Sequence, residues 1–198
     1  SYVATATAPA VQKLLDAGAL YVGKTNLDQF ATGLNGTRTP YTIPRIVYGG
    51  EMISGGSSSG SALAVALGQV PFAVATDTAG SGRVPAALNG VVGFKPSRGL
   101  ISTVGLVPAC KSLDCLSVMA GSVDDVDRVL DVMVGRDDDD PWSRDRGPRF
   151  SGGPIRVGLP PTSELEFFGD DEMRRADLAF REHLARAATI VDVSLAPF

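Results

Sequence analysis

The chain carries, at residues 54–98, the sequence SGGSSSGSALAVALGQVPFAVATDTAGSGRVPAALNGVVGFKPSR. Two loops rich in glycine and serine, 55–61 and 76–82, enclose an apolar helix predicted over 61–67 and an apolar strand predicted over 72–75. A helix of about ten residues rises ~15 Å, and a returning strand of about six residues spans ~20 Å. Because these lengths nearly match, we expect the two loops to meet at one end of the pair.

The second loop runs into a short predicted helix that ends near Gly90, because Pro85 suits a first helical turn. Ser81 then stands just before a helix N-terminus, where unpaired N–H groups and the positive end of the dipole favour a developing oxyanion. Glycines in both loops let backbone amides approach a bound group closely. The pattern fits a serine nucleophile, and it also fits a pair of Gly/Ser-rich turns without chemistry.

A serine nucleophile needs a base, and the chain offers few candidates. His183, the only histidine, lies about a hundred residues further on, in a charged stretch that predicts a surface helix. A Ser-His-Asp triad is therefore not expected. A lysine base remains open, although none of the four lysines lies inside a serine loop: Lys13, Lys24, Lys95 and Lys111.

The rest of the chain alternates helical and strand patterns, which is typical of a layered α/β domain. The patterns predict helices over 9–17, from near Asn26, over 122–134 and over 171–188, and strands over 19–22, 155–159 and 189–193. The whole chain, 1–198, is expected to be part of a single domain. Within it, residues 136–153 (RDDDDPWSRDRGPRFSGG) predict a surface linker whose acidic run is solvated rather than metal-binding.

Composition excludes several classes of protein. Lys+Arg number 18 and Asp+Glu 22, and a net charge of -4 disfavours nucleic-acid binding. No apolar run is long enough to cross a bilayer, and no secretory signal is visible at the start, which begins with Ser and looks cut. Cys110, Cys115 and one distant histidine cannot complete a zinc site, so we expect reduced core thiols and a cytoplasmic protein.

One nucleotide-binding motif is rejected on its context. Residues 18–25, GALYVGKT, match the phosphate-loop pattern G-x-x-x-x-G-K-[ST]. Such a loop follows a strand and wraps phosphates with its amides, whereas residues 19–22 inside this motif are themselves predicted as a strand. We do not expect a nucleotide here.

Three segments carry a resemblance to a known family: GGSSSGS at 55–61, TDTAGSGRVPAA at 76–87 and GFKPSRG at 93–99. They resemble the amidase signature family, whose hydrolases use a Ser/cis-Ser/Lys triad. Further segments extend the likeness and are most similar to its allophanate hydrolases: NLDQFATGL at 26–34, PACKSLDC at 108–115 and LEFFGD at 165–170. The glutamyl-tRNA amidotransferase subunits of the family more often have glycine at the position of Ala79 and a branched residue at that of Gly82.

The resemblance implies an α/β fold in which a central mixed twisted sheet is covered by helices on both faces, with this chain as an internal portion. It implies hydrolysis of a small-molecule amide without metal or organic cofactor, with allophanate converted to ammonia and carbon dioxide in urea degradation. A general amidase or the glutaminase subunit of a tRNA amidotransferase remains an alternative, as does a non-catalytic fragment. A homodimer and a functional link to a urea carboxylase also stay open.

The resemblance also implies roles for individual residues. Ser81 matches the nucleophile, and Ser57 matches the bridging serine, whose preceding peptide bond from Gly56 is cis in the family. The oxyanion-hole donors match the backbone amides of Thr78, Ala79, Gly80 and Ser81. Supporting or substrate-lining positions match Ser58, Asp77, Arg83 and Gly33.

The chain departs from the family pattern in three places. The family's catalytic lysine belongs to a segment that would precede residue 1, and Lys24 matches a different family lysine. Family members also continue beyond Phe198 with further strands and substrate-binding residues. The segment VYGGEMIS at 47–54 fits the usual lead-in to the first serine loop poorly. We therefore expect an internal piece of a longer enzyme.

Overall fold

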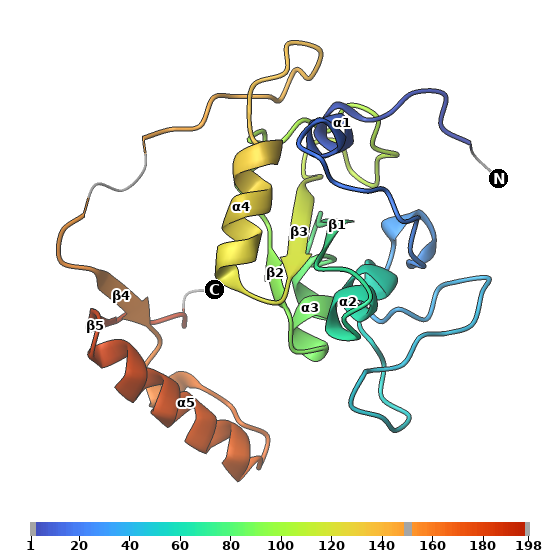
Figure 1. Cartoon of the computed structure of the whole chain (residues 1–198). Helices are drawn as coiled ribbons and strands as arrows, with labels where there is room; N and C mark the ends of the chain where they lie inside the picture. The colour runs from blue at the N-terminus through green and yellow to red at the C-terminus, as the bar shows by residue number, and fades with distance from the viewer. Residues whose placement is uncertain (1–2, 149–151, 197–198) are drawn as a thin grey trace. The chain divides into compact units, whose positions relative to one another are not determined.

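The computed structural model describes residues 3–148 and 152–196, which fall into two compact units (Figure 1). Unit 1 comprises Ser1–Arg146 and unit 2 comprises Gly147–Phe198. The division falls inside the predicted linker. In the described part of the chain, no helix is both long and apolar enough to cross a membrane.

Unit 1 is built on a three-stranded antiparallel sheet. Its strands are β1 (Phe72–Thr76), β2 (Val92–Phe94) and β3 (Leu116–Ala120), in the order β1-β3-β2. All five residues of β3 are buried, because β3 is the central strand and helices cover both of its faces. Strands buried on both faces carry apolar or small residues at every position, as LSVMA does here.

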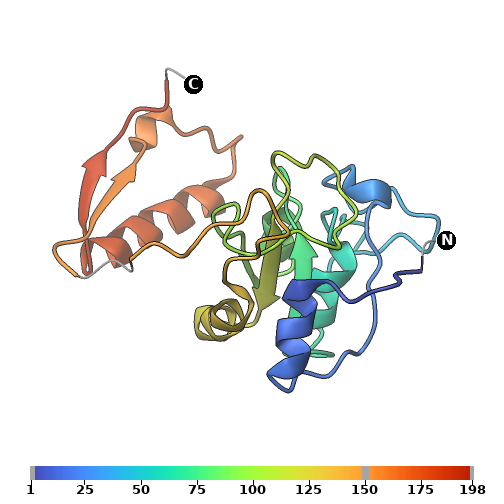
Figure 2. The ribbon, with the colours of Figure 1, turned by 90° about the horizontal axis from the view of Figure 1, so that it is seen from above.

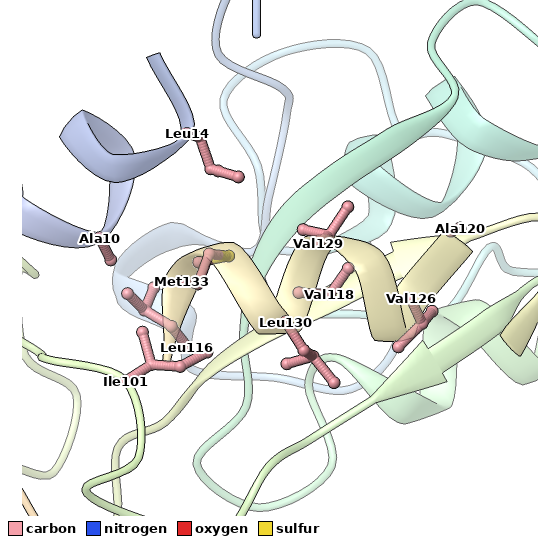
Figure 3. Close-up of a cluster of buried hydrophobic side chains, with 10 residues drawn as sticks. All are labelled: Ala10, Leu14, Ile101, Leu116, Val118, Ala120, Val126, Val129, Leu130 and Met133. Carbon is pink, nitrogen blue, oxygen red and sulfur yellow. The ribbon is translucent and has the colours of Figure 1, made fainter. Parts of the chain in front are cut away.

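One face of the sheet packs against α1 (Pro9–Asp16) and α4 (Val123–Met133). Alternate β3 side chains point to this layer, because successive side chains of a strand face opposite ways. The buried cluster between these elements is shown in Figure 3 and consists of Ala10, Leu14, Ile101, Leu116, Val118, Ala120, Val126, Val129, Leu130 and Met133.

The opposite face packs against α2 (Ser59–Ala66) and α3 (Arg83–Leu88). Its buried apolar residues are Ala62, Val65, Ala75, Ala86 and Met119. These side chains are smaller than those of the first cluster, so the two helices lie close to the sheet. Both serine loops lead directly into this layer, at the start of α2 and of α3.

Unit 2 is a small βαβ element. The parallel strands β4 (Arg156–Leu159) and β5 (Thr189–Asp192) are connected through α5 (Asp171–Ala185), which packs against β5 (Figure 2). Parallel neighbours need such a crossover. The Asp170 carboxylate caps α5 by accepting from the amides of Glu172 and Met173, both at 2.9 Å.

Most predicted elements are present. The helices and strands predicted around the serine loops are confirmed, as is the cap of α4, where Ser122 Oγ accepts from the Asp125 amide at 3.2 Å. Short 3₁₀ turns occur at Gln29–Ala31, in place of the helix predicted near Asn26, and at Thr162–Glu164. The α/β class with helices on both sheet faces is confirmed, with the strands divided between two small sheets.

The strand predicted over 19–22 is wrong. Leu20, Tyr21 and Val22 have no regular secondary structure and are highly exposed, and no described strand pairs with them. The phosphate-loop motif still lacks its context, because residues 18–25 follow α1 rather than a strand and lead into irregular chain.

Two predictions about polar and sulfur-containing side chains need correction. Cys115 is buried and free as expected, but Cys110 is free and exposed, because it lies in the turn before β3. In the acidic run, Asp138 and Asp139 are exposed, whereas Asp140 is buried. Asp140 accepts hydrogen bonds from the amide and hydroxyl of Thr103 at 2.7 and 2.9 Å, so this part of the linker is attached to unit 1.

Candidate active site

The two serine loops are joined by hydrogen bonds at the start of α2. The Ser58 amide donates to the carbonyl oxygen of Ser81 at 3.2 Å. The Ser58 hydroxyl donates to the Thr76 carbonyl at 3.2 Å, and its oxygen accepts from the Thr76 amide at 3.3 Å. Ser58 thus contacts the second loop at both of its ends, so the loops predicted to meet do lie together.

Ser57 has unusual surroundings for a serine. The Gly56–Ser57 peptide bond is cis, as the resemblance implied. The Ser57 side chain is fully buried, and its Oγ has no hydrogen-bond partner among residues 3–148 and 152–196. Buried hydroxyls are almost always paired, and an unpaired one is a mark of a functional position or an absent partner. Ser81 is also buried, with 5% of its surface exposed.

Asp77 organises the loop that contains Ser81. One carboxylate oxygen accepts from the Gly80 amide at 2.7 Å, and the other accepts from the Arg83 amide at 3.1 Å. The Arg83 guanidinium adds two bonds, Nε at 2.9 Å and Nη2 at 3.0 Å. Such a two-point ion pair fixes orientation as well as distance.

The same contacts set the charge of Asp77. Burial would raise the pKa of its carboxyl, but the hydrogen bonds from Arg83 and Gly80, together with the guanidinium charge, outweigh burial and hold the pKa below its ordinary value of 3.8. The pKa of Arg83 is raised by the same pair. Asp77 is therefore an anion at neutral pH, and the loop is held by charge-assisted bonds.

These contacts use one of the backbone amides around Ser81 and leave the others without an acceptor in the described part of the chain. The amide of Gly80 donates to Asp77, so in this structure it holds the loop instead of facing a bound group. The amides of Thr78, Ala79 and Ser81 donate to no acceptor in the described part of the chain. Three of the four predicted donors are therefore free to bind an oxygen atom.

Asp114 is a supporting residue that the sequence did not single out. Its Oδ1 accepts from the Thr78 hydroxyl at 2.5 Å and from the Cys110 amide at 2.9 Å, while Oδ2 accepts from the Ala109 amide at 3.1 Å. Asp114 therefore attaches the 108–113 turn to the loop that contains Ser81. The hydrophilic segment KSLD gave no signal that Asp114 is buried.

Asp28 plays the same part for the first loop. Its buried carboxylate accepts from the amides of Gly36 at 3.0 Å and Arg38 at 2.7 Å, and its own amide donates to the Ser57 carbonyl at 2.9 Å. A Cβ on Gly56 would lie 2.1 Å from Asp28 Oδ2, and one on Gly33 would lie 2.8 Å from it. In the sequence, these two glycines are the only local indication that the Asp28 carboxylate is buried. Gly33 supports Asp28 because it has no side chain and leaves room for the carboxylate.

Comparison with known proteins agrees with this arrangement. The family model described as Amidase matches residues 1–198. The chain belongs to the amidase family. It is 47% identical over 199 residues to the urea amidolyase of Lachancea kluyveri, covering 99% of this chain and 11% of that protein.

Two further relatives place the amidase chain within larger proteins. The solved structure of Kluyveromyces lactis allophanate hydrolase superposes with a TM-score of 0.91 at 44% identity, covering 99% of this chain and 32% of that one. A glutamyl-tRNA(Gln) amidotransferase subunit from Symbiobacterium thermophilum is 42% identical over 166 residues, covering 80% of this chain and 34% of that protein. The chain therefore spans about a third or less of these relatives.

Among the described residues, none of the bases considered from the sequence is hydrogen-bonded to Ser57. His183 is exposed on α5 in unit 2. Lys13 donates to the Met133 carbonyl at 3.3 Å, and Lys95 donates to the Pro96 carbonyl at 2.7 Å. None of these groups bonds Ser57 Oγ, whose described surroundings offer no partner.

A metal centre in this amidase chain finds no support. Within residues 3–148 and 152–196, no three side chains of His, Cys, Asp or Glu are grouped so that they could hold a metal ion. The buried carboxylates of Asp28, Asp77 and Asp114 are each occupied by hydrogen bonds to loop groups. These hydrogen bonds hold the two serine loops in place.

Proposed function

We propose that the protein containing this chain is an amide hydrolase in which Ser81 is the nucleophile and Ser57 is the bridging serine of a Ser/cis-Ser/Lys triad. One observation supports this most directly. The hydroxyl of Ser57 is buried and has no hydrogen-bond partner within residues 3–148 and 152–196, in a loop hydrogen-bonded to the carbonyl of Ser81. An ordinary Gly/Ser-rich turn pair would have no reason to leave such a hydroxyl unpaired.

The proposed mechanism moves one proton along two serines. A lysine outside this chain takes a proton from Ser57, Ser57 takes the proton of Ser81, and Ser81 Oγ attacks the carbonyl carbon of the amide. The negative oxygen of the tetrahedral intermediate then accepts hydrogen bonds from the free amides of Thr78, Ala79 and Ser81. The proton returns to the leaving nitrogen, ammonia departs, and water hydrolyses the acyl-enzyme.

The supporting residues keep this geometry fixed. Ser58 joins the two loops, and Asp77 and Arg83 orient the loop of Ser81 through four hydrogen bonds. Preorganised donors stabilise a transition state without reorganising when charge develops. Gly33 contributes by leaving space for the Asp28 carboxylate, which holds the first loop.

The proposed substrate is allophanate, which the enzyme would cleave to ammonia and a carbamate that decays to carbon dioxide and ammonia. The identities to a urea amidolyase and to an allophanate hydrolase structure support this choice. The name of the first relative, urea amidolyase, supports a role in urea degradation, and a functional link to a urea carboxylase is part of the proposal. No cofactor is needed. A cytoplasmic location, a homodimer and a single amidase domain that includes both units complete the proposal.

A second function has support of its own. The 42% identity to a glutamyl-tRNA(Gln) amidotransferase protein favours, as the alternative, a general amidase or a glutaminase subunit. A catalytically incomplete fragment is the remaining alternative, because the base would have to come from outside this chain.

Ammonia release by the complete polypeptide tests the assignment. We expect release from allophanate and none from glutamine, with Ser81→Ala inactive on both. Release from glutamine alone would favour the amidotransferase, and release from neither would favour the incomplete fragment. The exposed Ser97 provides a matched control, since Ser97→Ala should retain full activity.

A further inference from the structure

A second buried hydroxyl lies beneath the loop of Ser81. Ser117 is the second residue of β3, is fully buried, and has an Oγ without a hydrogen-bond partner in the described part of the chain. Its neighbour Met119, two positions along the strand, packs in the cluster with α2 and α3. Because side chains two apart on a strand share a face, Ser117 points to this layer as well.

The Ser117 side chain lies directly against Gly82, the residue that follows Ser81. A Cβ built on Gly82 would be 2.3 Å from Ser117 Oγ and 3.0 Å from Ser117 Cβ. The first distance is far shorter than any real contact between such atoms. The Ser117 side chain therefore fills the space that a side chain at position 82 would need.

Backbone conformation does not explain the glycine at this position. Gly82 has φ -90° and ψ -40°, in the right-handed helical region that every L-residue adopts. Most glycines in tight loops are required by a positive φ, and Gly82 is not one of them. The requirement for glycine comes from neighbouring side chains instead, of which Ser117 is the nearest and Asp77, whose Cβ would lie 3.2 Å away, is the next.

The neighbouring strand supports the same turn in a similar way. A Cβ on Gly93 of β2 would lie 2.9 Å from the Gly82 carbonyl oxygen and 3.3 Å from Arg83 Cα. Gly82 and Arg83 therefore pack directly against the sheet, next to Ser117 of β3 and Gly93 of β2. The distance between this turn and the sheet therefore determines the position of Ser81, which is one residue before the turn.

We infer that Ser117 is a positioning residue for Ser81: its side chain supports Gly82 and thereby fixes the nucleophile hydroxyl relative to the free amides. This inference rests on the proposed role of Ser81. It assigns a function to a buried hydroxyl that makes no hydrogen bond within the described residues and lies outside both serine loops. It also predicts that residues 82 and 117 are coupled, such that only one of them can have a side chain.

A double-mutant cycle in the complete polypeptide tests the inference. Gly82→Ala should lower kcat at least 30-fold with KM within about threefold, because the new methyl displaces the turn. Ser117→Gly should lower kcat about tenfold, because Gly82 loses its support. In the double variant Gly82→Ala with Ser117→Gly, the methyl group added at position 82 takes the place of the serine side chain. The kcat of this variant should return to within about threefold of wild type. Gly82→Ala with Ser117→Ala should be intermediate, since the Cβ–Cβ contact of 3.0 Å remains.

Matched measurements separate positioning from folding. Each variant is also assayed for thermal unfolding and for the rate at which Ser81 is acylated by substrate or labelled by a fluorophosphonate probe, and the labelling rate should follow kcat. Gly121, whose added Cβ would meet nothing within 4 Å, supplies the control pair, and Gly121→Ala should be additive with Ser117→Gly.

The outcomes are distinct. Recovery of kcat and labelling rate in the double variant supports the positioning role. A double variant as slow as Gly82→Ala, or a Gly82→Ala variant as fast as wild type, overturns it while leaving the proposed function intact. A wild-type protein that neither reacts with the probe nor releases ammonia overturns the proposed function and the positioning role together.

Discussion

The amide of Ser58 donates a hydrogen bond of 3.2 Å to the carbonyl oxygen of Ser81. This bond joins the two serine loops through residues that are 23 positions apart in sequence, and it involves the neighbour of one proposed catalytic serine and the backbone of the other. The arrangement leaves both serine side chains free of the contact. It is therefore compatible with a role for the side chains in chemistry and for the backbone in alignment.

Ser57→Ala should lower kcat by a factor of about 10² to 10⁴ with KM little changed, the range typical of a lost proton-transfer group. The variant should fold normally, because Ser57 Oγ makes no hydrogen bond in the described structure that the mutation would break. Steady-state kinetics with a parallel unfolding curve provides the measurement. If the unfolding curve shows that loss of folded protein accounts for the whole loss of activity, a catalytic role for this hydroxyl is contradicted.

Asp28→Ala should destabilise unit 1 by about 3 kcal/mol, because the buried amide of Gly36 and the part-buried amide of Arg38 would lose a charged acceptor. Urea unfolding followed by the fluorescence of Trp142, the only tryptophan of the 198 residues, measures this change. Asp127, which is exposed on α4, is the matched control, and Asp127→Ala should stay within about 0.5 kcal/mol of wild type.

The Asp77–Arg83 pair predicts a pH dependence with a defined sign. Because the folded-state pKa of Asp77 lies below its ordinary value of 3.8, the stabilisation is complete above that value and is lost as the pH falls through the folded pKa. Asp77→Asn should therefore be less stable than wild type by about 2 kcal/mol at pH 7, and the gap should narrow only below about pH 4.

The control for this prediction is an acidic residue in an exposed pair. Asp138 contacts Arg136 at the surface, and Asp138→Asn should leave the stability and its pH dependence unchanged. If the stability gap between wild type and Asp77→Asn instead narrows as the pH rises from about 6 to 8, Asp77 titrates above its ordinary range, and the ion pair does not hold it as an anion.

Asp140→Ala should destabilise unit 1 by about 3 kcal/mol, whereas Asp139→Ala should have little effect. Asp140 is buried and accepts from the Thr103 amide and hydroxyl and from the Trp142 amide at 2.9 Å. Burial would raise its pKa, but these bonds and the charge of Arg98 lower it. The carboxylate of Asp139 is exposed. Similar stability of the two variants by Trp142 fluorescence would refute the attachment of this segment.

The sequence was sufficient for features that depend on local patterns. The helix at 59–66 and the strand at 72–76 follow from apolar runs between glycines, and the start of α4 follows from a serine cap. The matching lengths of helix and strand also placed the two serine loops together. These predictions succeed because neighbouring residues determine them.

Features that depend on distant residues could not be predicted. Leu20, Tyr21 and Val22 have a strand composition but no partner strand in the described structure, and pairing is a tertiary property. Asp28 is held by the amides of Gly36 and Arg38, and Asp114 by the hydroxyl of Thr78, which is 36 positions earlier. Ser117 gave no signal, because its importance arises from Gly82, which is 35 positions earlier.

The most direct test of the proposed chemistry is the site of covalent reaction. The complete polypeptide is treated with a fluorophosphonate probe, digested, and analysed by mass spectrometry for the modified peptide. We expect one adduct on Ser81, which is absent in Ser81→Ala, retained in Ser97→Ala and formed much more slowly in Ser57→Ala. An adduct on another serine, or unchanged labelling in Ser81→Ala, would contradict the assignment of Ser81 as the nucleophile.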